Sequence, residues 1–255
     1  PATASHERLP VRVCLIVPAL NESAAIAAVV RGGARHVETV YVVDDGSTDG
    51  TADVARSAGA TVVQHETNRG KGVAICSGIE AAARDGYDAA ITIDGDGQHD
   101  PSDIPRFIER QRATGAHVVV GTRMSDTGPM PIHRRMNNRL VSAVGQWLSN
   151  SVAPDFQCGY RLVLIEPFRR LALETRGYEL EAELLLRLGR AGYTIDGIPV
   201  ATVYAGEVSH VRPLREMLRF TRLLFRSLDA PERRRGATIS TTPNTTPEDA
   251  DVLPD

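Results

Sequence analysis

The chain has 255 residues, enough for one large α/β domain or two small ones. Its net charge of −3 argues against a nucleic-acid binder, and no apolar run reaches the ~18 residues that predict a membrane span. The odd number of widely spaced cysteines (Cys14, Cys76, Cys158) excludes a disulfide framework, and the first ten residues lack a signal-peptide core, so we expect core thiols and a cytoplasmic location.

Strands and helices alternate along the first half of the chain. A β-branched run at 11–20 predicts a strand buried on both faces. The Ala-rich segment 21–34 predicts a helix that stops at Gly32 and Gly33. By the same patterns we expect strands near 37–44, 61–66, 87–94 and 116–123 and helices near 52–60, 70–86 and 101–115, with Ser47 to Asp49 available to cap the helix at 52–60.

The pattern is less regular after residue 124. Helices are expected at 132–150 and 178–192, and one or two strands at 193–204. Residues 229–255 are rich in Pro, Thr and Asp without an apolar period, which predicts a disordered tail.

The alternation predicts a largely parallel sheet, in which ligands bind beyond the carboxyl ends of the strands. Polar clusters follow four of the expected strands, so we expect a functional rim there. The clusters are Asn21 with Glu22, Asp44 with Asp45, Asp94 with Asp96, and Arg123.

Two common nucleotide sites do not fit this rim. The first strand–helix junction reads PALNES (18–23), without the glycines of a dinucleotide site. The segment NRGKGVA (68–74) lacks the upstream glycine and the hydroxyl of a P-loop. A nucleotide-sugar site remains as the third class. Such a site needs carboxylates for the base and ribose and a divalent cation on the diphosphate, and the rim supplies carboxylates.

The segment 91–100 fits that third class. On a straight strand, Asp94 and Asp96 would point to one face and could share a Mg²⁺ or Mn²⁺ ion, with Gln98 adding an amide oxygen. The alternative interpretation is a solvated Asp/Gly turn. His99 follows this motif and is expected to shape the loop.

Six blocks of the sequence, spread over residues 11–212, occur in the order seen in a known family: VPALNES, VVDDGSTDGT, NRGKGVA, IDGDGQHDPSDIP, VVGTR and DFQCGYRL. The chain resembles the family 2 glycosyltransferases of the GT-A fold, and among them the polyprenyl-phosphate sugar synthases of the dolichyl-phosphate mannose synthase type. It departs from them at Gly95, where the family often has Ala, and in lacking the C-terminal membrane helices of many members.

The resemblance implies a Rossmann-like α/β domain, a nucleotide-sugar donor, a polyprenyl-phosphate acceptor and a Mg²⁺ or Mn²⁺ cofactor. It implies one GT-A domain over 1–228, with a donor half (about 11–123), an acceptor half (about 124–212) and a helix at 213–228. By position, it implies that Pro18, Asn21, Glu22, Asp45 and Lys71 border the nucleotide, that Asp94, Asp96 and Gln98 bind the metal, that Arg123, Ser209 and Arg212 approach phosphate, and that Asp155, Gln157 and Arg161 flank the sugar and acceptor.

Sugar transfer would expel a nucleoside diphosphate, whose negative charge calls for a metal ion and for cations such as Arg123 and one of Arg134 or Arg135. A phosphate acceptor is already anionic and needs no base, whereas a hydroxyl acceptor would need one. Asp155 is the candidate base, with a salt bridge to Arg161 as the alternative. The arginines after residue 120 favour a phosphate acceptor, and a single displacement would invert the anomeric centre.

Residues 213–228 have apolar residues along one helical face and Arg215, Arg219, Arg222 and Arg226 on the other. Such a helix can rest on anionic lipid, which would place the protein peripherally on the inner face of the membrane. The alternatives are a helix packed on the core or a dimer contact. Two other functions remain open: transfer to a soluble hydroxyl-bearing acceptor, and nucleotide-sugar sensing without catalysis.

Overall fold

The computed structural model describes residues 11–122, 155, 158–175, 177 and 179–201, and the structural statements below concern these residues. Their strands form a single seven-stranded sheet in the order β3-β2-β1-β4-β6-β5-β7. The strands are β1 (Val13–Ala19), β2 (Val40–Asp44), β3 (Thr61–Gln64), β4 (Ala89–Thr92), β5 (Val118–Thr122), β6 (Arg161–Leu164) and β7 (Ile195–Pro199).

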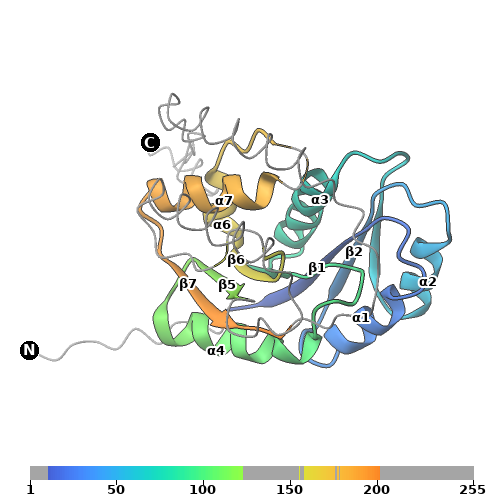
Figure 1. Cartoon of the computed structure of the whole chain (residues 1–255), viewed down its shortest axis with the longest axis horizontal. Coiled ribbons are helices and arrows are strands. Elements are labelled where there is room, and N and C mark those ends of the chain that lie inside the picture. The colour runs from blue at the N-terminus through green and yellow to red at the C-terminus, as the bar shows by residue number, and fades with distance from the viewer. Residues whose placement is uncertain (1–10, 123–154, 156–157, 176, 178, 202–255) are drawn as a thin grey trace, which may run out of the picture.

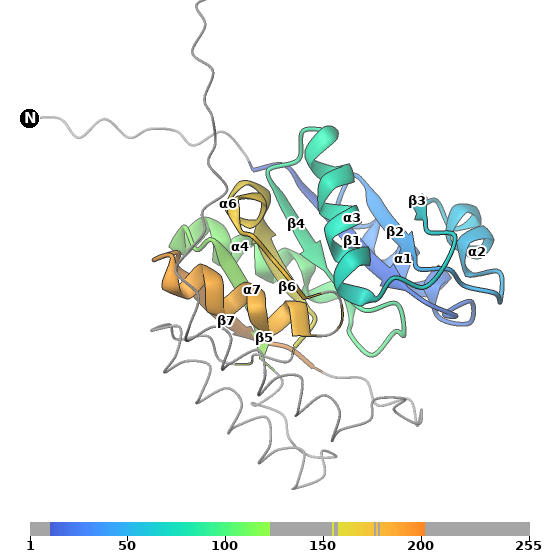
Figure 2. The ribbon, with the colours of Figure 1, turned by 90° about the horizontal axis from the view of Figure 1, so that it is seen from above.

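Helices cover both faces of this sheet (Figures 1 and 2). Helices α3, α6 and α7 lie on one face, and α1 and α4 lie on the other, with α2 packed beside α1. The predicted α/β architecture is therefore confirmed. The helices are α1 (Ile26–Gly33), α2 (Thr51–Ser57), α3 (Lys71–Arg84), α4 (Ile104–Thr114), α6 (Ile165–Arg170) and α7 (Glu179–Arg190), with a short 3₁₀ helix, η1 (Pro101–Asp103), before α4.

The centre of the sheet is the predicted buried strand. Residues Cys14 to Val17 of β1 have no exposed surface, as expected for a parallel strand covered by helices on both faces. The parallel register with β2 pairs Ala19 with Asp44, and Ile93, just past β4, donates its N–H to the carbonyl of Ile16. The carboxyl ends of β1, β2 and β4 therefore meet at one rim.

Strand β6 and helix α6 were not expected from the sequence. Strand β6 runs antiparallel to both of its neighbours, β4 and β5, so the sheet is mostly but not wholly parallel. Because β6 lies between two strands of the donor half, the proposed donor and acceptor halves share one sheet.

The start of α2 differs from the prediction in detail. The residue before its first turn is Gly50, with a left-handed backbone (φ 84°), rather than a residue of the expected capping segment. Asp49 nevertheless satisfies the first turn, because its Oδ1 accepts the N–H of Thr51 at 3.0 Å. Asp49 Oδ2 accepts the N–H of Ser23 at 3.0 Å, which ties this turn to the loop after β1.

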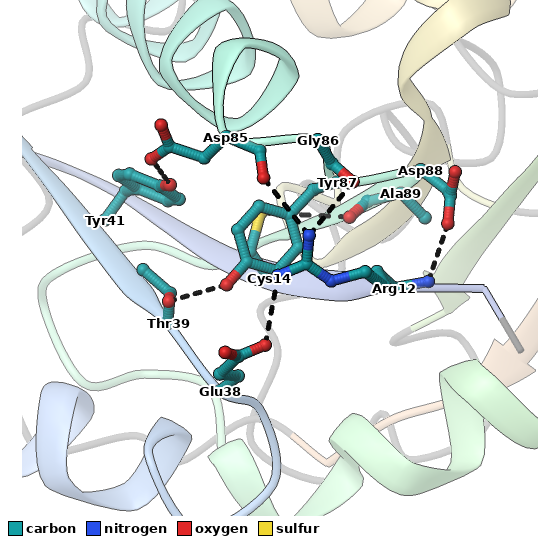
Figure 3. Close-up of polar contacts among 10 residues, drawn as sticks. All are labelled: Arg12, Cys14, Glu38, Thr39, Tyr41, Asp85, Gly86, Tyr87, Asp88 and Ala89. Atoms are coloured by element: carbon teal, nitrogen blue, oxygen red, sulfur yellow. Dashed lines mark hydrogen bonds and ion pairs between the residues drawn. The ribbon is translucent and has the colours of Figure 1, made fainter.

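A polar network closes the opposite end of the strands (Figure 3). The N–H of Arg12 donates to Asp88 Oδ2 at 2.8 Å, and its guanidinium lies 4.5 Å above the ring of Tyr87. The same guanidinium pairs with Glu38 at 3.2 Å, while the Tyr41 hydroxyl donates to Asp85. These contacts join the starts of β1, β2 and β4 and lie away from the rim, so they stabilise the sheet.

Within the described residues, no helix is both long enough and apolar enough to cross a bilayer. The helices expected at 132–150 and 213–228 and the tail expected at 229–255 lie outside the described residues. The boundaries of the donor and acceptor halves stay a prediction.

Candidate active site

The loops after β1 and β2 are bound to each other at the rim. Asn21 has a left-handed backbone (φ 57°), and its Oδ1 accepts the N–H of Thr48 at 2.9 Å. The N–H of Asn21 donates to Ser47 Oγ at 2.9 Å, and that of Glu22 donates to Thr51 Oγ1 at 2.8 Å. The Asn21 side chain thus holds the two loops together beside the predicted nucleotide site.

Asp45 organises the loop that leads into α3. Its carboxylate is buried and accepts the N–H groups of Arg69 at 3.0 Å and Gly70 at 2.7 Å. The ring of His65 contacts the same carboxylate, with Nδ1 2.6 Å from Oδ1, and its Nε2 lies 3.0 Å from Ser77 Oγ. Asp45 therefore has three protein partners here, a positioning role that the sequence did not show.

Lys71 is the first residue of α3 and bridges two carboxylates. Its Nζ lies 2.6 Å from Asp94 Oδ1 and 2.9 Å from Glu181 Oε1. Burial by itself would lower the pKa of Lys71, but the charges of Asp94 and Glu181 raise it above its ordinary value, so the ammonium stays protonated. The Lys71 side chain is only 13% exposed, so this charge cluster is largely screened from water.

The expectation that Asp94 and Asp96 lie on a straight strand was wrong. Strand β4 ends at Thr92, and both aspartates follow it: Asp94 lies just before a turn, and Asp96 lies within that turn. Asp96 Oδ1 accepts the N–H of Gln98 at 2.9 Å, which fixes the turn. Both aspartates are therefore placed at the rim by the segment after β4 and not by the strand pleat.

The residues around this turn fit a divalent cation that is held jointly with a ligand. No three His, Cys, Asp or Glu side chains of the described residues form a group that could hold a metal on their own. Mg²⁺ commonly takes one or two carboxylates and completes its shell with phosphate oxygens and water. Asp94 and Asp96 supply such carboxylates, and the ammonium 2.6 Å from Asp94 shows that a cation is favoured there.

Arg161 and Glu181 connect strand β6 and helix α7 to this cluster. Arg161 is buried in β6, where its Nε donates to the carbonyl of Cys158 at 2.6 Å and its Nη1 donates to the carbonyl of Glu181. These bonds fix the start of α7, so Arg161 positions the backbone. Glu181 was not among the predicted site residues, although its carboxylate lies on the same face of the helix as Leu184, Leu185 and Leu188, which is a signal that it is buried.

The other predicted residues are placed as follows. Pro18 is buried in β1, and Asp155 is fully buried. His99 is buried with its ring centroid 5.4 Å from that of Tyr160, which agrees with a role in shaping the loop. Five predicted site residues lie outside the described residues, and their roles stay predictions: Arg123, Arg134, Gln157, Ser209 and Arg212.

The cysteines behave as expected for core thiols. Cys14 and Cys158 are fully buried, and all three are free. Burial raises the pKa of Cys14 to about 12 and that of Cys76 to about 11, so neither forms the thiolate that a nucleophile would need at neutral pH.

Comparison with known proteins supports an enzyme. The sequence model of Glycosyl transferase family 2 matches residues 14–171. The chain is 31% identical over 206 residues to an undecaprenyl-phosphate mannosyltransferase of Micrococcus luteus, covering 75% of this chain and 84% of that one. It is 28% identical to a UDP-N-acetylglucosamine–dolichyl-phosphate N-acetylglucosaminyltransferase of Methanococcus voltae, covering 85% and 94% of the two chains.

Solved structures share the fold. A glucosyl-3-phosphoglycerate synthase of Mycobacterium tuberculosis, crystallised with Mn²⁺, UDP-glucose and phosphoglyceric acid, superposes with a TM-score of 0.63 at 24% identity, covering 85% of this chain and 78% of that one. With the rim of carboxylates and the match over most of the described sheet, these findings identify the chain as a glycosyltransferase of the GT-A fold that belongs to glycosyl transferase family 2.

Proposed function

We propose that this enzyme transfers a hexose from a nucleoside-diphosphate sugar, of the GDP-mannose or UDP-glucose type, to polyprenyl phosphate, with inversion and with a Mg²⁺ or Mn²⁺ ion, at the cytoplasmic face of a membrane. The observation that carries the proposal is the rim where the Asp94–Asp96 turn, the Lys71 ammonium and the loops after β1 and β2 converge. The names of two sequence relatives, both polyprenyl- or dolichyl-phosphate sugar transferases, support the acceptor class.

The residues divide the chemistry among them. Asp94 and Asp96 would hold the cation, which neutralises the charge that builds up on the leaving diphosphate. Asn21 and Asp45 keep the nucleotide loops in place through the contacts described above. Lys71 presents a protonated ammonium at the start of α3, where a phosphate group could accept hydrogen bonds from it.

The acceptor decides whether a base is needed. A phosphate monoester attacks as an anion, so no side chain has to remove a proton. A soluble acceptor with a hydroxyl group would need a base, and Asp155 would be the candidate. Because Asp155 is fully buried among the described residues, we favour the phosphate acceptor.

The proposed function is tested by tracing a radiolabelled sugar from the donor to its product. The protein is incubated with Mg²⁺ or Mn²⁺, radiolabelled nucleotide sugars and membrane extract, and the label is expected in an organic-extractable, acid-labile lipid. Label in a new water-soluble glycoside would instead establish a soluble acceptor, and no transfer from any donor would refute enzymatic activity with this panel.

A matched pair of variants tests the cation site. Asp96→Ala is expected to abolish transfer with an unchanged circular dichroism spectrum. Asp53→Ala serves as the control, because it removes an aspartate that is 85% exposed in an ion pair on α2. Full activity of Asp96→Ala would remove this residue from the cation site.

A further inference from the structure

We propose that Lys71 is a placeholder cation for Asp94, and that Glu181 on α7 is the positioning residue that keeps Lys71 paired when a divalent cation takes Asp94. This inference rests on the proposed metal-dependent function. It assigns to Glu181 a role in cation binding that works through Lys71.

The first step is the charge arrangement. One ammonium lies between two carboxylates, 2.6 Å from Asp94 Oδ1 and 2.9 Å from Glu181 Oε1. The side chains of Lys71 and Glu181 are 13% and 10% exposed, whereas that of Asp94 is 29% exposed. Asp94 is thus the more accessible of the two carboxylates, and Glu181 is the more buried one.

The second step is that Glu181 is fixed in place. Its carbonyl accepts a hydrogen bond from the buried guanidinium of Arg161. Two residues along α7, the fully buried Glu183 accepts the N–H groups of Glu174 at 3.0 Å and Thr175 at 2.8 Å and pairs with Arg187 at 2.6 Å. The start of α7 is therefore anchored to β6 and to the segment before it.

The third step is that Lys71 is the member able to adjust. Its charge sits at the end of a flexible four-carbon chain, whereas Glu181 is held by an anchored helix. Gly159 faces both acids: a Cβ there would lie 3.0 Å from Asp94 Oδ2 and 3.1 Å from Glu181 Oε1. In this proposal Lys71 shifts from Asp94 toward Glu181 without leaving the cluster, because its Nζ already lies 2.9 Å from Glu181 Oε1.

In this arrangement the Lys71 ammonium and a divalent cation compete for the Asp94 carboxylate. A divalent cation at Asp94 displaces the ammonium, and a buried ammonium without a counter-charge is strongly disfavoured. The Glu181 carboxylate removes that penalty, so it strengthens cation binding even though it does not bind the cation itself. It also links the acceptor half to the donor site, since α7 and α3 carry the two partners.

The test is a double-mutant cycle read by Mn²⁺ binding, with free Mn²⁺ measured by electron paramagnetic resonance. Glu181→Gln is expected to weaken Mn²⁺ binding about tenfold, and Lys71→Gln to tighten it severalfold. In the Lys71→Gln background, Glu181→Gln is expected to weaken Mn²⁺ binding by clearly less than tenfold, because only the direct attraction between Glu181 and the cation remains. Glu80→Gln is the control, because this α3 carboxylate is 55% exposed and pairs with Arg169.

An equal effect of Glu181→Gln in both backgrounds would mean that Glu181 acts on the cation directly, which overturns the inference while leaving the proposed function intact. Absence of Mn²⁺ binding by every variant, the unaltered protein included, would overturn both. Thermal unfolding in EDTA tests the bridge without metal: Lys71→Gln is expected to lower Tm, and adding Glu181→Gln to restore part of the loss. No restoration would show that Lys71 does not separate two mutually repelling acids.

Discussion

The replacement Gly159→Ala is expected to damage the active site without unfolding the protein. The added Cβ would lie 3.0 and 3.1 Å from the two carboxylate oxygens of Asp94 and 3.1 Å from Glu181 Oε1. These separations are a few tenths of an ångström shorter than ordinary contacts. The backbone has little freedom to retreat, because the carbonyl of Gly159 accepts a 2.8 Å hydrogen bond from the buried hydroxyl of Thr92.

Both carboxylates must therefore move away from Gly159. A displacement of about 1 Å at a reacting group can cost about 100-fold in rate, so a shift of a few tenths of an ångström is expected to lower kcat/KM by about tenfold. The stability cost is expected to lie at or below the ~1–3 kcal/mol of an overpacked core, since the crowded groups lie at the rim. Sugar transfer kinetics and thermal unfolding measure the two effects separately.

A second glycine provides the matched control. A Cβ at Gly95 would have its nearest neighbours, in Ala19, Glu22 and Pro18, at 3.4 Å, which is ordinary contact. Gly95→Ala lies between the two aspartates of the turn and is expected to keep kcat/KM within about threefold of the unaltered enzyme. Unaltered kcat/KM in Gly159→Ala would refute the view that this glycine makes room for the two acids.

Three further changes test other parts of the structure. His65→Phe keeps an aromatic ring but removes a hydrogen-bond partner of the buried Asp45 carboxylate. It is expected to lower the free energy of unfolding in urea by about 1–3 kcal/mol and to raise KM for the donor. An unchanged KM would show that His65 does not position the nucleotide loop. Asp49→Ala removes the acceptor for Thr51 and is expected to cost about 1 kcal/mol at neutral pH. Hydrogen bonds, chiefly from Thr51, lower the pKa of Asp49 in the folded protein, so its contribution to stability is complete above the unfolded-state pKa of about 4 and is lost as the pH falls through the folded-state pKa. The unfolding free energies of Asp49→Ala and the unaltered protein should therefore converge in acid. A difference that does not change with pH would contradict this reasoning. Changing Arg219 and Arg222 together to Glu is expected to reduce co-sedimentation with anionic vesicles, and undiminished binding would remove the membrane role from segment 213–228.

Much of the parallel sheet could be predicted from local sequence. The continuous apolar run in β1 and the alternation of strands and helices up to β5 determine both the layers and the rim. Strand β6 was missed because it has four residues and begins with a buried arginine, which gives neither an apolar run nor an alternation. Its guanidinium donates to the carbonyl of Cys158, three residues earlier, and to that of Glu181, which only the folded chain brings near.

The site could be predicted in its members but not in its pairings. The sequence indicated Lys71 and Asp94 separately, yet their ion pair joins the start of α3 to the turn after β4. Glu181 lies 110 positions beyond Lys71 in the chain, so no local pattern could bring the two together. Likewise, Asp45 was predicted at the rim, but its partner His65 becomes visible only when β3 is placed beside β2.

The order of strands in the sheet also constrains how the chain can fold during synthesis. Among the strands of the described residues, β5 pairs only with β6 and β7, which are both translated after it, whereas β1 to β4 pair with one another as soon as they emerge. A nascent chain that ends near residue 122 would therefore carry an apolar strand without neighbours, which is prone to aggregation. We therefore expect β5 to join the sheet only after β6 has been translated and has docked beside β4.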